Sequence, residues 1–310
     1  MPRPARILLV DDDRLQHRLV EGMVKGFRSE AFELETVDNY AAGLKKLFSG
    51  QFAVCLLDYQ LGERDGLALL REAKAAGCET PVIMLTSDTR DDVDLAALEA
   101  GASDYLIKGE LTARTLERAI RYARKLGQTL TQLRQLATHD ELTGITNRRE
   151  FQRALAEEWR RSERFKRPFA LVLADLDHFK LINDTHGHQV GDEVLKHVAS
   201  LLAGQVRTVD RVARHGGEEF AVLMVETDRK AAVAAMQRLY ALLAETPCVI
   251  PGKNLTIPVT LSAGVAAMPS DASSPAELIA KADKALYAAK KAGRNRIVTA
   301  DGKVVKSAVG

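Results

Sequence analysis

The side chains of this sequence that are best suited to chemistry are polar groups that follow short apolar runs. Four such runs each end in a ligating or charged residue: 6–10 precede Asp11 and Asp12, 52–57 precede Asp58, 81–85 precede Thr86, and 105–107 precede Lys108. A cluster of three carboxylates requires a cation, and Mg²⁺ prefers such oxygen ligands. Asp58 can then accept a phosphoryl group, which Thr86 can hydrogen-bond and Lys108 can neutralise.

A second acidic group follows two glycines in the stretch Gly216-Gly217-Glu218-Glu219-Phe220. Gly-Gly favours a two-residue β-hairpin turn, because both positions accept a positive φ. The missing side chains let a large ligand approach the backbone, and the adjacent carboxylates can hold a divalent cation. A further apolar run, 169–174, ends at Asp175 and Asp177, which share a face only while the strand continues.

The elements that position the first group follow from the spacing of the apolar residues. Segments with helical periodicity, such as 65–75 and 91–100, lie between the four apolar runs. Alternating strands and helices predict a doubly wound parallel α/β sheet, in which polar residues at the carboxyl ends of the strands converge. Taken alone, Asp12 fits a helix cap as well as a metal ligand, and Asp13 is expected to be a solvated cap.

This pattern closely resembles bacterial response-regulator receiver domains over roughly residues 4–125. The resemblance implies a flavodoxin-like fold, phosphorylation of Asp58 and a histidine kinase as partner. The chain departs from the receiver pattern at Gly109, because proline commonly follows the lysine there. The residues that the resemblance assigns are the switch residues Thr86, Tyr105 and Lys108, and the Mg²⁺ site of Asp11, Asp12, Asp58 and Gln60.

The stretch 214–220 resembles the signature of the GGDEF family, the diguanylate cyclases, in its GGEEF variant, and 139–149 resembles the motif that opens these domains. The resemblance covers about residues 139–300. It implies an α+β domain with a palm-like mixed or antiparallel sheet and an active site on the β-hairpin. Asp177 is then expected to be an acceptor that stabilises a turn. The catalytic residues implied are Asp175, Glu218 and Glu219, and the ligands of Mg²⁺ or Mn²⁺ are Asp175, the Leu176 carbonyl, Glu218 and Glu219.

The same resemblance implies that GTP is the substrate. Asn183 offers a donor and an acceptor and Asp192 only accepts, a combination that suits guanine better than adenine. Lys290 and Arg294 stand at the end of the last predicted helix, where the resemblance implies contacts to the terminal phosphates. The other substrate contacts are placed at Phe179, Lys180, Gly216 and Gly217.

A third motif precedes the hairpin. Arg207 and Asp210 form an RxxD motif that resembles the family's inhibitory site for its product, cyclic di-GMP, with Arg238 as a second contact. Arg–Asp pairs of this spacing are otherwise ordinary surface ion pairs of small energetic value.

The joint between the two halves is a long predicted helix. Residues 110–138 contain no proline, and their apolar residues recur at spacings of three and four. The first part is expected to lie on the receiver, and 126–138 to form a short coiled coil of two chains, weakened by alanines and by Gly127. The seam consists of Leu116, Ala119, Ala123, Leu126, Leu130, Leu133 and Ala137.

The composition limits the remaining possibilities. The net charge of +2 provides no basic field for nucleic acid. No apolar run reaches the ~20 residues of a membrane-spanning helix, so no membrane insertion and a cytoplasmic location are expected. The domains are predicted at 1–125 for the receiver, 126–138 for the linker, 139–300 for the cyclase and 301–310 for a tail.

Together these motifs predict a phosphorylation-regulated diguanylate cyclase that condenses two GTP into cyclic di-GMP and two diphosphates. Each site holds one GTP, so a homodimer is required. The alternative is an inactive GGDEF domain that acts as a cyclic di-GMP receptor under receiver control. The intact signature acids and glycines favour the cyclase.

Overall fold

The computed structural model describes residues 4–28, 30–62, 64–87 and 91–306. The chain divides into two compact units, residues 1–134 and 135–310. None of the helices in the described ranges is long and apolar enough to cross a membrane.

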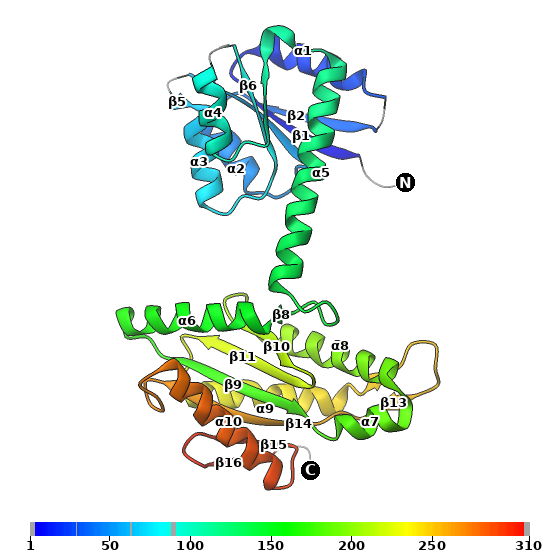
Figure 1. The fold of residues 1–310 in the computed structure, drawn as a ribbon, viewed down its shortest axis with the longest axis vertical. Coiled ribbons are helices and arrows are strands. Elements are labelled where there is room, and N and C mark those ends of the chain that lie inside the picture. Colours follow the sequence, from blue (N-terminus) through cyan, green and yellow to red (C-terminus); the bar gives the residue numbers. More distant parts are fainter. Residues whose placement is uncertain (1–3, 29, 63, 88–90, 307–310) are drawn as a thin grey trace. The chain divides into compact units, whose positions relative to one another are not determined.

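The first unit contains a five-stranded parallel sheet with the strand order β2-β1-β3-β6-β7 (Figure 1). Its strands are β1 (Ala5–Val10), β2 (Phe32–Val37), β3 (Val54–Asp58), β6 (Val82–Thr86) and β7 (Asp104–Ile107), and a small ribbon joins β4 (Gln60–Leu61) to β5 (Arg64–Asp65). The helices are α1 (Arg14–Lys25), α2 (Tyr40–Leu47), α3 (Gly66–Ala75), α4 (Asp91–Glu99) and α5 (Ala113–Thr138), with a 3-10 turn at Lys108–Glu110. The predicted doubly wound sheet is confirmed.

Helices cover both faces of this sheet, which explains why its central strands are almost entirely apolar. Ile7 and Leu9 of β1 pack against α1 and α5. Leu8 and Val10, which alternate with them, pack against α2 and α3. The strand ends that carry the predicted phosphoacceptor residues therefore project from a rigid sheet.

Helix α5 is continuous from Ala113 to Thr138. Its first half buries Leu116, Ile120 and Ala123 against the sheet, as predicted. Gly127 does not interrupt the helix, and its weakening of the two-chain seam stays a prediction. A Cβ at this position would lie 2.6 Å from Cγ of Pro81, so the glycine lets the helix pass close to the first unit. Contacts with that unit thus continue beyond the predicted boundary at residue 125.

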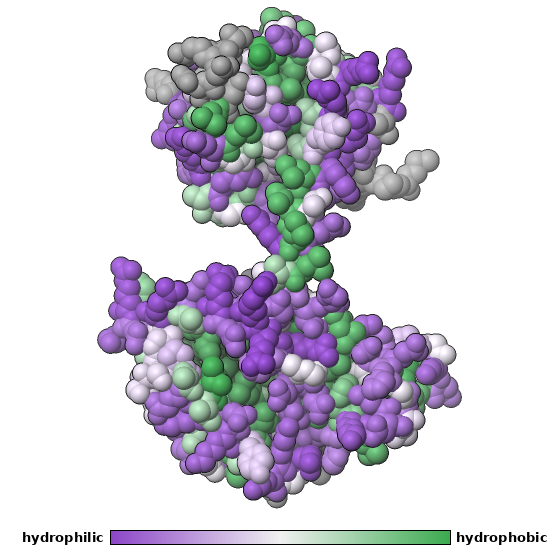
Figure 2. Space-filling model, in the orientation of Figure 1, coloured by the Kyte–Doolittle hydropathy of each residue, from purple (hydrophilic) through white to green (hydrophobic). Residues whose placement is uncertain are grey.

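Apolar side chains of the second half of α5 remain exposed. Figure 2 shows hydrophobic residues gathered along this part of the helix. The four leucines, each between 48% and 60% exposed, are Leu126, Leu130, Leu133 and Leu136. Leu126, Leu130 and Leu133 belong to the predicted seam, whereas Leu136 stands one residue before its last member, Ala137. The two-chain coiled coil stays a prediction.

The second unit contains a seven-stranded mixed sheet with the strand order β16-β15-β14-β9-β11-β10-β8. Its strands are β8 (Thr146–Asn147), β9 (Phe169–Leu176), β10 (Arg211–Gly216), β11 (Glu219–Val225), β14 (Leu261–Met268), β15 (Arg296–Thr299) and β16 (Val304–Lys306), and β12 (Cys248–Val249) pairs separately with β13 (Thr256–Ile257). The helices are α6 (Arg148–Phe165), α7 (Phe179–His186), α8 (His188–Gln205), α9 (Arg229–Glu245) and α10 (Pro275–Lys291).

Strand β9 lies at the centre of this sheet, antiparallel to both β11 and β14. All eight of its residues are buried, which agrees with the apolar run 169–174, and Asp175 is the one charged residue of the strand. Val172 and Ala174 face a core built with α8 and α9, whereas Leu171 and Leu173 face a core built with α6 and α10. Asp175, two residues after Leu173, continues the face covered by α6 and α10.

Candidate active site and phosphoacceptor site

In the first unit, the carboxyl ends of β1, β3 and β7 bring the predicted phosphoacceptor residues together. Lys108 Nζ lies 2.8 Å from Asp11 Oδ2 and 2.9 Å from Asp58 Oδ2. Oxygen atoms of Asp11, Asp12 and Asp58 all lie within 4.8 Å of one another. Asp11 is buried and Asp12 exposed, so one side of the cluster is open to solvent.

The electrostatics of this cluster suit a divalent cation. Burial raises the pKa of Asp58, an effect that the neighbouring Asp11 strengthens and the Lys108 ammonium opposes. Crowded carboxylates of this kind are stabilised by an added cation with oxygen preference, as Mg²⁺ has. Asp12 also accepts from the Gly62 backbone N–H at 3.0 Å, so its role as a ligand stays open.

The other predicted receiver residues lie on the strands and turns of the same unit. Thr86 is buried at the carboxyl end of β6, and Tyr105 is half-buried on β7 against the core. Gln60 is exposed, and its backbone N–H bonds to Asp58. Gly109 lies within the 3-10 turn after β7. Asp13 caps α1 by accepting from the Leu15 N–H at 2.8 Å, as expected.

In the second unit, the hairpin of β10 and β11 differs from the predicted one by one residue. Gly216 pairs with Glu219, so the two-residue turn is Gly217-Glu218 and not Gly216-Gly217. The cause is an irregularity between Arg214 and Gly216, which shifts the register of β10. Of the two glycines, only Gly217 has a positive φ, +41°. Glu218 therefore lies in the turn itself.

Sheet pairing brings the hairpin acids to β9. Asp175 of β9 has a register partner on each side, Glu219 of β11 and Ser262 of β14. The Leu176 N–H donates to the Glu218 carbonyl at 3.2 Å, which ties the turn to the end of β9. The predicted residues Asp175, Leu176, Glu218 and Glu219 therefore meet at one end of the sheet.

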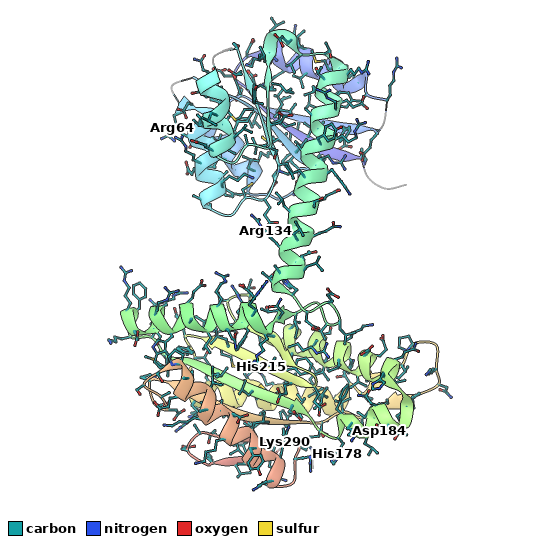
Figure 3. The ribbon with its side chains drawn as sticks, viewed as in Figure 1. Arg64, Arg134, His178, Asp184, His215 and Lys290 are labelled. Atoms are coloured by element: carbon teal, nitrogen blue, oxygen red, sulfur yellow. The ribbon has the colours of Figure 1, made fainter. Side chains whose placement is uncertain are left out.

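Lys290 of α10 forms an ion pair with one acid of this group. Its Nζ lies 2.7 Å from Asp175 Oδ2, and the Asp175 side chain is only 7% exposed. Figure 3 shows Lys290 and His178, which precedes α7, at the same edge of the unit. Lys290 thus contacts the acid to which the metal is assigned, while its predicted contact with a terminal phosphate stays a prediction.

The site carries more negative charge than one lysine neutralises. Burial raises the pKa of Asp175, against the effect of Lys290, and Glu219 and Asp177 raise it further. Burial and the Asp175 carboxylate raise the pKa of Glu218. Asp175, the Leu176 carbonyl and Glu218 offer only oxygen ligands. This donor set fits Mg²⁺ or Mn²⁺.

Helices α7 and α8 carry the residues predicted to read a base. Asn183 Oδ1 is buried without a hydrogen-bond partner among the described residues, and a buried acceptor without a partner is unusual in a folded protein. A Cβ on Gly191 would lie 1.9 Å from this oxygen, so the glycine leaves room for the Asn183 side chain in this position. Asp192 is exposed, next to Gly191 at the start of α8. Phe179 is buried beneath them, and Lys180 is exposed.

Sequence reasoning missed the residues that surround Asp177. Its carboxylate accepts from Thr260 Oγ1 at 2.8 Å, from Ser262 Oγ at 2.7 Å and from the Asn295 backbone N–H at 2.9 Å. This agrees with the expected acceptor role. The sequence feature that could have indicated these donors is the pair of hydroxyl residues Thr260 and Ser262, two positions apart at the start of an apolar run.

The RxxD residues lie at the base of the hairpin and bond to each other. Asp210 is buried and accepts from the backbone N–H groups of Arg207 and Val225 at 2.9 and 3.0 Å. The Arg207 guanidinium contacts Asp210 and the hydroxyl of Thr227, yet its side chain is 59% exposed. Arg238 is exposed on α9. The pair is therefore part of the fold and also accessible to a ligand through Arg207.

Comparisons with known families agree with this division of the chain. A family profile described as "Diguanylate cyclase, GGDEF domain" matches residues 137–296, and one described as "Response regulator receiver domain" matches residues 7–121. The response regulator PleD of Caulobacter vibrioides is 32% identical over 303 residues, which cover 94% of this chain and 65% of that protein. The diguanylate cyclase DgcP of Pseudomonas aeruginosa is 42% identical over 167 residues, covering 54% of this chain and 24% of that protein. The chain thus spans less than two thirds of the length of either relative.

Two solved structures similar to the chain contain GGDEF domains. The coiled coil and GGDEF domain of DgcB from Caulobacter crescentus, in complex with cyclic di-GMP, matches 60% of this chain and 97% of that one. The TM-score is 0.55 at 30% identity. The GGDEF domain of the same protein alone, also with cyclic di-GMP, matches 54% of this chain and 97% of that one with a TM-score of 0.51 at 32% identity.

Proposed function

This chain belongs to the GGDEF family of diguanylate cyclase domains and carries a response-regulator receiver domain; on this premise we propose that it is a phosphorylation-controlled diguanylate cyclase. It condenses two GTP into cyclic di-GMP and two diphosphates. The observation that carries the proposal is the convergence of Asp175, Glu218 and Lys290 at the hairpin, together with the buried acceptor of Asn183 that has no partner among the described residues.

Each half of the reaction forms one phosphodiester bond. The 3′-hydroxyl of one GTP attacks the α-phosphorus of the other, loses its proton, and releases diphosphate. Asp175, the Leu176 carbonyl and Glu218 would hold a divalent cation, which neutralises phosphate charge and favours ionisation of the attacking hydroxyl. Lys290 and the exposed Arg294 would bind the leaving diphosphate, and Asn183 with Asp192 would orient guanine.

Two sites must face each other for this chemistry, because the product joins two nucleotides that are bound by separate domains. We propose a homodimer whose pairing uses the exposed leucines of α5. Phosphorylation of Asp58 by a histidine kinase adds charge beside Lys108 and Thr86. This change alters how the receivers pack, and with it the alignment of the two α5 helices.

A single assay tests the proposal. The purified chain is incubated with GTP and Mg²⁺, with and without acetyl phosphate, and nucleotides are separated by chromatography. We expect cyclic di-GMP in both samples and more of it with acetyl phosphate. Asp58→Asn should abolish the increase, whereas the exposed control Asp38→Asn should retain it. Binding of cyclic di-GMP without any synthesis would instead favour the receptor function.

A further inference from the structure

The segment after α10 has an unusual backbone. Gly293, Arg294 and Asn295 are three consecutive residues with positive φ, at +106°, +59° and +46°. Glycine adopts this conformation freely, but arginine and asparagine do so at a cost. Surrounding contacts must therefore hold the last two residues in place. Arg294 is the residue proposed above to bind a terminal phosphate.

Asp177 supplies such a contact from a different part of the chain. Its Oδ2 accepts from the Asn295 backbone N–H at 2.9 Å and from Thr260 Oγ1 at 2.8 Å, while Oδ1 accepts from Ser262 Oγ at 2.7 Å. The Asp177 N–H donates to the Thr260 carbonyl at 2.9 Å. The residue is 5% exposed. One buried side chain thus joins the end of β9, the start of β14 and the left-handed segment.

We infer that Asp177 is a positioning residue, which fixes the backbone from which Arg294 extends and so links the metal-binding end of β9 to recognition of the terminal phosphates. The inference deepens the proposed function and rests on it. The rival role is that of a further metal ligand acting through its charge, as proximity to Asp175 suggests. Three neutral donors already occupy the two Asp177 oxygens, which favours positioning over metal binding.

Two substitutions separate these roles. Asp177→Ala removes both the acceptor and the charge. Asp177→Asn removes the charge but keeps one oxygen for the Asn295 N–H and Thr260, while its amide can donate to Ser262, whose hydroxyl can rotate to accept. Positioning therefore predicts that Asn restores what Ala loses. A metal-ligand role predicts that both variants fail alike.

Nucleotide binding gives a readout that does not depend on turnover. The probes are the α,β-methylene analogue of GTP, which cannot release diphosphate, and GMP, which lacks the terminal phosphates. Calorimetry with Mg²⁺ should show that Asp177→Ala raises the Kd of the analogue by about 10-fold to 100-fold, the value of one charge-assisted contact, and leaves GMP binding within about 3-fold. Asp177→Asn should stay within about 3-fold for both probes. The matched control is Asp283→Ala, an exposed aspartate on α10.

A double-mutant cycle tests the link to Arg294 directly. If Asp177 acts through this arginine, Arg294→Ala should weaken analogue binding about as much as Asp177→Ala, and the double variant should be no weaker than either. Independent, additive losses would overturn the inference, as would equal weakening of GMP. If Asp177→Ala does not fold, Asp177→Asn decides alone: retained affinity supports positioning, and lost affinity overturns it.

Failure of this inference and failure of the proposed function give different results. If the chain binds the analogue but makes no cyclic di-GMP, the cyclase proposal is refuted. The double-mutant cycle of Asp177 and Arg294 can still be measured, because it is read from analogue binding. A chain that binds neither GTP nor its analogue overturns both.

Discussion

At the scale of single residues, burial raises the pKa of two acids at the hairpin site, Asp175 and Glu218. Asp175 is buried and Glu218 lies partly buried beside it. The ion pair with Lys290 opposes the rise in the pKa of Asp175. The proposed divalent cation at Asp175 and Glu218 would favour ionisation of both carboxyls.

Replacing one of these acids tests its assigned role. Glu218→Gln keeps the size of the side chain but removes a charged metal ligand at the turn. We expect cyclic di-GMP synthesis to fall by at least ~10²-fold, because the cation supplies most of the charge stabilisation in phosphoryl transfer. Initial rates at saturating GTP and Mg²⁺ provide the measurement. Glu245→Gln, at an exposed glutamate ending α9, is the control. Near-normal turnover of the Glu218→Gln variant would refute the assignment.

The sequence predicted individual reactive groups better than their partners. Asp58 and Lys108 follow apolar runs, and the rule for parallel strands brings them together, as the 2.9 Å contact shows. The donors to Asp177 could not be predicted in this way. Thr260 and Asn295 lie far from it in sequence, and only the pairing of β9 with β14 and the path of the chain after α10 bring them near.

At the scale of elements, the position of Lys290 beside Asp175 depends on how closely α10 approaches β14. A Cβ on Gly264 would lie 2.0 Å from the Ala282 carbonyl oxygen and 2.4 Å from the Leu286 backbone nitrogen. The glycine therefore permits the close packing of this helix, whose last turn carries Lys290. Sequence alone shows a glycine within an apolar strand, which indicates close backbone approach but not the element that approaches.

A substitution at this glycine should cost stability. Gly264→Ala forces backbone atoms of α10 away from the sheet, so we expect the free energy of unfolding to fall by about 1–3 kcal/mol, as for other overpacked cores. Gly204→Ala is the matched control, because nothing lies within 4 Å of its added Cβ in α8. That control should be neutral or stabilising by up to ~1 kcal/mol. Urea unfolding followed by circular dichroism measures both. Equal stability of the two variants would contradict the packing argument.

The hairpin shows where prediction of an element failed by one residue. Glycine pairs favour a two-residue turn, but the irregularity after Arg214 advances the register so that Glu218 enters the turn. A bulge is set by how the two strands pair, and the preference of glycines for turns gives no information about that pairing. The location of the hairpin was nevertheless predicted.

Helix α5 offers a test of coupling along the chain. Gly127 lies against Pro81 in the first unit, and within the second unit Asn147 and Arg149 donate to the Ala137 carbonyl at 2.9 and 2.7 Å. Leu130→Pro should break the helix between these contacts. We expect the increase of activity with acetyl phosphate to disappear, while Leu130→Ala, which preserves the helix, retains part of it. The ratio of rates with and without acetyl phosphate is measured. An unchanged ratio in the proline variant would show that the helix does not transmit the signal.

At the scale of the whole molecule, the proposed reaction requires two GTP sites to meet, so regulation is expected to act on that meeting. Each cyclase domain is proposed to bind one GTP, so any ligand that fixes two domains apart stops synthesis without occupying the hairpin. Cyclic di-GMP, with two phosphates and two guanines, has the symmetry to join two copies. Arg207 is accessible for such a contact, since its side chain is 59% exposed although it also pairs with Asp210.

We predict that cyclic di-GMP inhibits synthesis through Arg207. The guanidinium can bind a phosphate or a guanine edge by two parallel hydrogen bonds. Removing it in Arg207→Ala should raise the concentration of cyclic di-GMP needed for half-inhibition by about 10-fold to 100-fold. Arg160→Ala, at an exposed arginine of α6, is the control and should leave this concentration unchanged. Rates are measured over a matrix of GTP and product concentrations. Because the two ligands occupy separate sites, added GTP should not relieve the inhibition. Competitive inhibition, or none, would reduce the Arg207–Asp210 pair to a structural contact at the base of the hairpin.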